Sequence, residues 1–106
     1  MDWRREAGNR PAWLNDDNSV DLLFPLSYHE GETEKRIASL MLRRLTGKER
    51  RMMDAPGLHT DKLLNIVSAM TGHPVLVLER WDSVDQDRLD DVLGYFMEPG
   101  SATMPT

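Results

Sequence analysis

The sequence of 106 residues contains no cysteine, which excludes disulfide bonds, zinc–thiolate sites and thiol catalysis. Aromatic residues make up only 7% of the chain. Long hydrophobic runs are also missing: the longest, Val75–Leu78, is far shorter than the roughly 20 residues that cross a bilayer. Residues 1–8 are mostly polar and lack the apolar segment of a signal peptide. We therefore expect a soluble protein of the cytoplasm with no membrane partner.

Catalytic and metal-binding motifs are absent as well. The sequence has no G-x-S-x-G, Walker A or G-x-G-x-x-G pattern. Its three histidines, His29, His59 and His73, lack the spacing of metal ligands. The acidic stretch from Asp82 to Asp91 has no glycine at the sixth position of a calcium loop. We interpret these carboxylates as a helix N-terminus and a solvated face, and we expect no enzyme activity, no metal and no cofactor.

The charge is unevenly distributed along the chain, although the net charge is only −5. Residues 35–51 hold seven Lys or Arg and one acid, whereas residues 81–98 hold six acids and one Arg. Three interpretations stay open: the basic middle binds an anionic partner, the two halves pair with each other, or both are solvated faces.

The N-terminal half predicts a β-hairpin. Val20–Leu26 has the composition of a short strand ended by a proline, and Lys35–Arg44 is expected to be the second strand. The connection Ser27–Thr33 contains Gly31 at the turn. A helix over Glu34–Leu45 is a rival, because its apolar residues also fit a helical period.

The C-terminal half predicts helices. Thr46 and Glu49 have the spacing of a capping box at the start of a helix that ends at Asp54, and Ser83 with Gln86 has the same spacing. Thr60 is expected to cap another helix, ended by a left-handed glycine at 72, and residues 75–81 are either a short helix or extended. Two apolar stripes have helical spacing and are expected to face each other: Leu63, Ile66, Val67 and Met70; and Leu89, Val92, Leu93 and Phe96.

These elements predict an α+β fold that is mostly helical, with a small N-terminal antiparallel β-hairpin followed by three to four short helices. We expect a flexible tail over residues 1–19, one compact domain over 20–98 and a second tail over 99–106. Trp3 and Trp13 interrupt the polar N-terminal segment, and each is either an anchor on the protein's own core or a contact for a partner.

Several stretches, taken in order, resemble the tail assembly chaperones of Mu-like and P2-like bacteriophages. Val20–Leu26 is similar to the family's first strand, V-x-L-x-x-P-L. Leu40–Arg43 is similar to the L-x-L-R strand that precedes a capping threonine, here Thr46. Ala69–Gly72 resembles a short L-T-G element at a helix end. Leu78–Leu89 matches the last pattern, L-x-x-[LW]-D-x-x-D-x-x-x-L.

The resemblance covers about residues 20–97. It implies a protein of the host cytoplasm that binds the phage tape measure protein and keeps it soluble during tail assembly. The tail tube protein is a further partner that it suggests, and homo-oligomerisation is left open. Such a role needs an apolar surface, which we expect near the last helix. The expected contact residues are Val75, Val77, Trp81, Tyr95 and Met97, although Trp81, at the junction before the last helix, is either a buried hinge or an interface anchor, with burial favoured.

Two alternatives remain. One is a small phage-encoded nucleic-acid-binding regulator that uses a basic patch of Arg43, Arg44, Lys48, Arg50 and Arg51. Nucleic acid is not the expected partner, because the chain is acidic and no aromatic residue is interleaved with these cations. The other alternative is a structural subunit of the virion.

Overall fold

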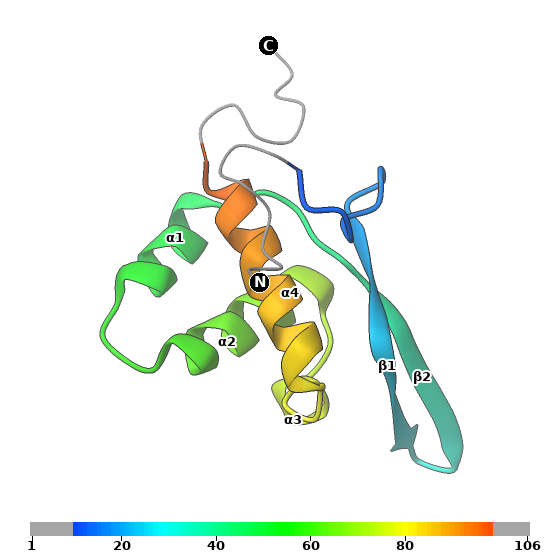
Figure 1. Cartoon of the computed structure of the whole chain (residues 1–106). Coiled ribbons are helices and arrows are strands. Elements are labelled where there is room, and N and C mark those ends of the chain that lie inside the picture. Colours follow the sequence, from blue (N-terminus) through cyan, green and yellow to red (C-terminus); the bar gives the residue numbers. More distant parts are fainter. Residues whose placement is uncertain (1–9, 99–106) are drawn as a thin grey trace.

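The fold is a long β-hairpin beside a group of short helices (Figure 1). The computed structural model describes residues 10–98. Within them, β1 (Ser19–Glu30) and β2 (Thr33–Met41) form an antiparallel two-stranded sheet. The helices are α1 (Gly47–Asp54), α2 (His59–Thr71), α3 (Val75–Leu78) and α4 (Ser83–Phe96). The expected α+β class, with an N-terminal hairpin before the helices, is confirmed.

The hairpin is longer and its turn tighter than the sequence predicted. Glu30 pairs with Thr33, so the expected loop over residues 27–33 is mostly strand. Gly31 has a φ of 65°, which a glycine adopts without strain at the first central position of a two-residue hairpin turn. The rival helix over residues 34–45 is excluded, because Thr33–Met41 is paired with β1 and the chain is non-helical from there to Thr46.

A large bulge interrupts β1. Asp21 pairs with Ser39 and Leu26 pairs with Ile37, so residues 22–25 of β1 lie opposite Ala38 alone. Such a bulge breaks the alternation of side chains between the two faces of a strand. Leu22 and Leu26 are buried, whereas residues 23 and 24 between them are exposed.

The helix ends follow local rules with two corrections. The capping box of Thr46 and Glu49 is present, and Gly72 ends α2 in the left-handed conformation with a φ of 80°. Thr60 is not a cap, because α2 starts one residue earlier and its N-cap, Leu58, makes no side-chain hydrogen bond. The cap of α4 is Asp82, whose carboxylate accepts from the amide of Val84, so the Ser83–Gln86 capping box is wrong.

The core joins the helices to the inner face of the hairpin. Both predicted apolar stripes contribute to it, with Met70 only partly buried. In Figure 1, α2 crosses α4 and does not lie along it. His59 Nε2 at the start of α2 lies 2.7 Å from Asp90 Oδ1 in the middle of α4. From β1 and β2 the core receives Val20, Leu22, Leu26, Ile37 and Leu40.

The compact part begins before residue 20, contrary to the expected tail over residues 1–19. Leu14 is buried and bridges to Val20. The indole Nε1 of Trp13 donates to the backbone oxygen of Arg88 on α4 at 3.1 Å. Trp13 is therefore an anchor on the protein's own core, which fixes residues 10–19 to the hairpin and α4. Trp3 and the expected C-terminal tail lie outside the described residues.

Candidate protein-binding surface

The contact residues expected near the last helix do not form an exposed surface. Trp81 is only 7% exposed, and its Nε1 donates to Gln86 Oε1 at 2.9 Å. Tyr95 is 6% exposed and packs against Phe96, with ring centroids 5.7 Å apart. The other three, Val75, Val77 and Met97, are half-buried. Trp81 and Tyr95 are thus core residues, and the apolar surface lies elsewhere.

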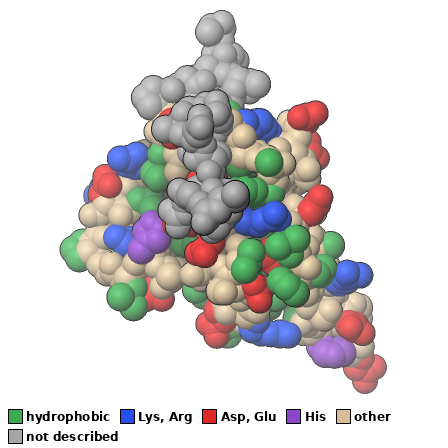
Figure 2. Space-filling model, in the orientation of Figure 1, with side chains coloured by type: hydrophobic (Ala, Val, Ile, Leu, Met, Phe, Trp, Pro, Cys, Tyr) green, Lys and Arg blue, Asp and Glu red, His purple; other side chains and the backbone are tan. Residues whose placement is uncertain are grey.

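Exposed apolar side chains gather where the bulge of β1 meets the first turns of α4. Leu23 is 51% exposed, Phe24 is 55% exposed and Val84 is 46% exposed. Trp13, Leu23 and Val84 line a hollow of about 270 Å³. We call Trp13, Leu23, Phe24 and Val84 the bulge patch. Figure 2 shows hydrophobic side chains gathered over α4, with charged side chains at their border.

A buried carboxylate holds the bulge in place. Asp85 is 1% exposed. Its Oδ1 accepts a hydrogen bond from the amide of Leu23 at 2.9 Å, and its Oδ2 accepts one from the amide of Phe24 at 3.1 Å. Both donors lack strand partners because the bulge removes them from the ladder. Asp85 does lie in the first turn of α4, as expected of a helix N-terminus, but it is not solvated, since tertiary structure places it in the interior.

The other wall of the hollow comes from α4 and the N-terminal segment. Val84, Asp87 and Arg88 lie at positions i, i+3 and i+4 and therefore share one face of the helix. The guanidinium of Arg88 lies 5.0 Å from the centroid of the Trp13 ring, a cation–π geometry. The patch is thus fixed from three sides, by the indole, the Asp85 carboxylate and the helix.

Sequence reasoning missed this patch because both of its causes are non-local. The run Leu22–Pro25 was expected to be ordinary strand, in which alternate residues face the core. The run of consecutive apolar residues before a proline was the available signal, since proline favours strand edges and bulges. The hydrogen-bonding partner, Asp85, lies about 60 residues further along the chain.

The basic patch is largely engaged within the protein. Arg43 makes two hydrogen bonds of 2.7 Å to the carboxylate of Glu49, one to each oxygen. These bonds hold the pKa of Glu49 below its usual value, although burial acts in the opposite direction. Arg44 donates to the backbone oxygen of Glu98 at 3.2 Å, and Arg50 lies 3.7 Å from Asp54.

The remaining two cations, Lys48 and Arg51, are exposed and line a shallow hollow on α1 with Met52 and Ala55. The structure therefore does not bring the five basic residues together as free charges on one face.

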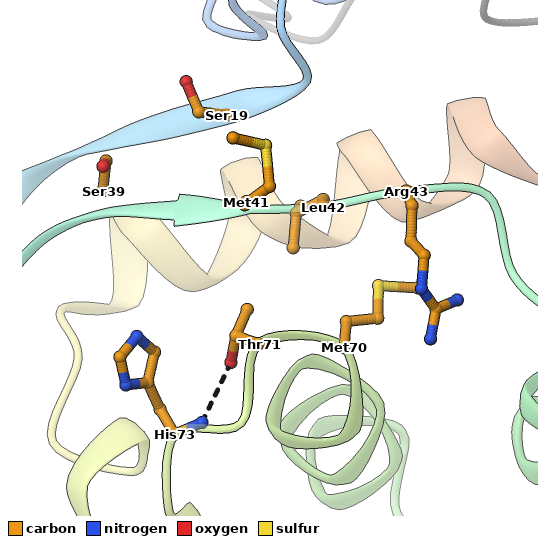
Figure 3. A pocket seen from close by; sticks show the side chains of 8 residues that line it. All are labelled: Ser19, Ser39, Met41, Leu42, Arg43, Met70, Thr71 and His73. Carbon is orange, nitrogen blue, oxygen red and sulfur yellow. Dashed lines mark hydrogen bonds between the residues drawn. The ribbon is translucent and has the colours of Figure 1, made fainter.

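A second hollow, of about 320 Å³, lies between the hairpin and the end of α2. Figure 3 shows Arg43 and Met70 pointing into the space between β2 and α2, with His73 to one side. Ser19 and Ser39 also line it, but the Ser19 hydroxyl donates to Asp17 and accepts from Asn15. No hydrogen bond described for residues 10–98 joins the His73 ring to either serine, so the hollow has no nucleophile–base pair.

No group of three or more His, Cys, Asp or Glu side chains in the described part of the chain is arranged to hold a metal ion. No helix between residues 10 and 98 is both long and apolar enough to cross a bilayer. No family model matches the sequence, and comparison with curated proteins and with solved structures found no match either.

Proposed function

We propose that this chain is a phage tail assembly chaperone, a non-enzymatic protein that binds the tape measure protein in the host cytoplasm and keeps it soluble until the tail is assembled. Two lines support the proposal. One is the resemblance over residues 20–97. The other, which carries the proposal, is the bulge patch: neighbouring apolar side chains held outward on a rigid support.

The bulge patch has the features of a binding surface. Large apolar side chains that are half exposed and contiguous favour association with an apolar partner surface. The ring of Phe24 offers a large contact area with few rotatable bonds. Burying a carboxylate to hold residues 23 and 24 outward is costly unless it is hydrogen-bonded, and each oxygen of Asp85 accepts one hydrogen bond. Such local conflicts with the rules of folding are concentrated at functional sites.

A chaperone that releases its partner when the tail assembles needs a limited, reversible interface. The bulge patch has few residues, so it suits a contact of the size seen in transient complexes. Charge disfavours nucleic acid as the partner. Arg43 is engaged by Glu49, and the bulge patch has carboxylates near it, which repel phosphates.

The test is co-expression with the tape measure protein encoded by the same genome. We expect this chain to co-purify with it and to raise its soluble yield. The double variant L23S/F24S removes the two bulge side chains and should abolish both effects. Leu58→Ser is the control, because Leu58 is also apolar and is even more exposed, at 69%, but lies between α1 and α2.

Each variant is first checked for folding by circular dichroism. If the unaltered chain neither co-purifies nor raises the soluble yield, the proposed function is wrong. If it does both and L23S/F24S behaves like Leu58→Ser, the chaperone function stands but the bulge patch is not its binding surface.

A further inference from the structure

Resting on the proposed function, we infer the kind of segment that the bulge patch binds. It is an α-helix of the partner that inserts one large apolar side chain between Trp13 and Leu23 and places a Lys or Arg one turn away, against Asp87. The inference rests on three features of the surface: its occupied backbone donors, the size of its hollow and the position of one carboxylate.

The occupied backbone donors exclude a partner that adds a strand to the edge of β1 at the bulge. Strand addition needs free amides and carbonyls along the edge. At the bulge the amides of Leu23 and Phe24 already donate to Asp85, and Pro25 has no N–H. Two residues beyond Pro25, the carbonyl of Ser27 accepts from Arg80 Nη2 at 2.8 Å. The partner is therefore recognised through side chains, as a helix in a groove is.

The size of the hollow sets the number of inserted side chains. Its volume is about 270 Å³ and its apolar walls are Trp13, Leu23 and Val84. An apolar cavity of roughly 150 Å³ holds a benzene ring. The hollow, which is open to solvent, accordingly accepts one large residue such as Leu, Phe or Met rather than a continuous apolar stripe.

The position of Asp87 adds a charge requirement. Asp87 lies one turn beyond Val84 on the same face of α4, and it is exposed. Among the lining residues that the structure describes, Arg88 is the one cation, and its guanidinium lies over the Trp13 ring. A partner helix lying along α4 with its anchor over Val84 brings the residue three or four positions away to Asp87. A basic residue is favoured there and an acidic one is repelled.

Peptides of about 20 residues, tiled along the tape measure protein, test this inference, since that length forms a helix of roughly 30 Å. Binding to the full chain is measured by fluorescence anisotropy of labelled peptides. We expect the binders to share a large apolar residue with Lys or Arg three or four positions away. Replacing that cation with Glu should weaken binding about twofold to fivefold at low salt, as for an exposed ion pair.

The charge-swap variant Asp87→Lys makes the test specific. It should bind the Glu peptide better than the Lys peptide, reversing the preference. Asp61→Lys, the same change at an exposed position on α2, should leave the preference of the unaltered chain in place. Circular dichroism establishes that both variants are folded.

The outcomes separate this inference from the proposed function. Two results overturn the helical-anchor inference while the chaperone function stands. In the first, the intact tape measure protein co-purifies but no peptide binds. In the second, the Lys and Glu peptides bind equally well both to Asp87→Lys and to the unaltered chain. If the intact tape measure protein does not co-purify, the proposed function fails and this inference fails with it.

Discussion

Asp85 on α4 and Leu23 on β1, 62 residues apart in the sequence, are joined by a hydrogen bond of 2.9 Å from the backbone amide of Leu23 to the buried carboxylate. The neighbouring amide of Phe24 donates to the other oxygen of the same carboxylate. This contact links the first turn of the last helix to the bulge in the first strand. It decides which side chains of the hairpin face solvent, and so it decides where the apolar surface lies.

The first prediction concerns this contact. In Asp85→Asn the side chain keeps one acceptor oxygen, but its amide group meets a backbone N–H, so one buried donor loses its partner. We expect the free energy of unfolding to fall by about 1–3 kcal/mol, the cost of an unsatisfied buried group. Hydrogen exchange at the amides of Leu23 and Phe24 should become faster.

Asp87→Asn is the control for this prediction, because it makes the same chemical change at an exposed position two residues away. Its effect on stability should stay within about 0.5 kcal/mol. Equal urea midpoints for the two variants would contradict the role assigned to Asp85.

The second prediction is a pH dependence that arises at Glu49. Its pKa is lowered from an ordinary value of 4.5, chiefly by the hydrogen bonds from Arg43. A carboxyl group whose pKa is lower in the folded state stabilises the fold above its unfolded pKa, and this contribution is lost as the pH falls through the folded value. At pH 7, Glu49→Gln should therefore be less stable than the unaltered protein by about 1 kcal/mol, since the guanidinium of Arg43 is nearly half exposed and screened.

Urea unfolding of both proteins, from neutral pH to below the folded pKa of Glu49, measures the effect. The difference should be largest at neutral pH and should shrink on acidification below 4.5, because a protonated glutamic acid resembles glutamine. Asp17, whose pKa is lowered by hydrogen bonds from Ser19, is present in both proteins and cancels in the comparison. A difference that stays constant with pH would exclude the Arg43–Glu49 pair as its source.

The third prediction concerns the packing of α4. Leu93 is fully buried in the core that the hairpin and the helices share. Leu93→Ala should lower the free energy of unfolding by about 2–5 kcal/mol, the cost of lost apolar burial and of the cavity that remains. Leu76→Ala removes the same atoms from an exposed position on α3 and should change it little. Thermal melts of the two variants that coincide would refute this arrangement of α4.

The fourth prediction concerns nucleic acid. We expect no salt-sensitive binding to double-stranded DNA near neutral pH, because the chain is acidic and Arg43 is held by Glu49. Fluorescence anisotropy with a labelled duplex at two salt concentrations measures this. Micromolar binding that weakens steeply with salt, and that disappears in the double variant R43A/R44A but not in Lys62→Ala, would make a nucleic-acid regulator the better hypothesis.

The parts of this fold that depend on local interactions could be predicted from the sequence. The capping box at Thr46, the turn at Gly31 and the left-handed end of α2 at Gly72 each depend on contacts within a few residues. The apolar stripes of α2 and α4 have the helical period, so their burial could be predicted without knowing what covers them. The positions of the helices and the fold class could therefore be predicted from the sequence.

The candidate site depended on contacts between distant parts of the chain. Residues 34–45 fit both a strand and a helix, and the pairing of Thr33–Met41 with β1 decided between them. Tyr95 was expected at the surface but is buried, and Trp81, for which burial and an anchor role were both open, is buried as well. A carboxylate of α4 that looked solvated is enclosed, and it turns Leu23 and Phe24 toward solvent. Local sequence determines which backbone conformations have the lowest free energy. The exposure of a side chain depends on distant elements: here α4, about 60 residues away, supplies the hydrogen-bonding partner of Leu23 and Phe24 and the surface that covers their neighbours.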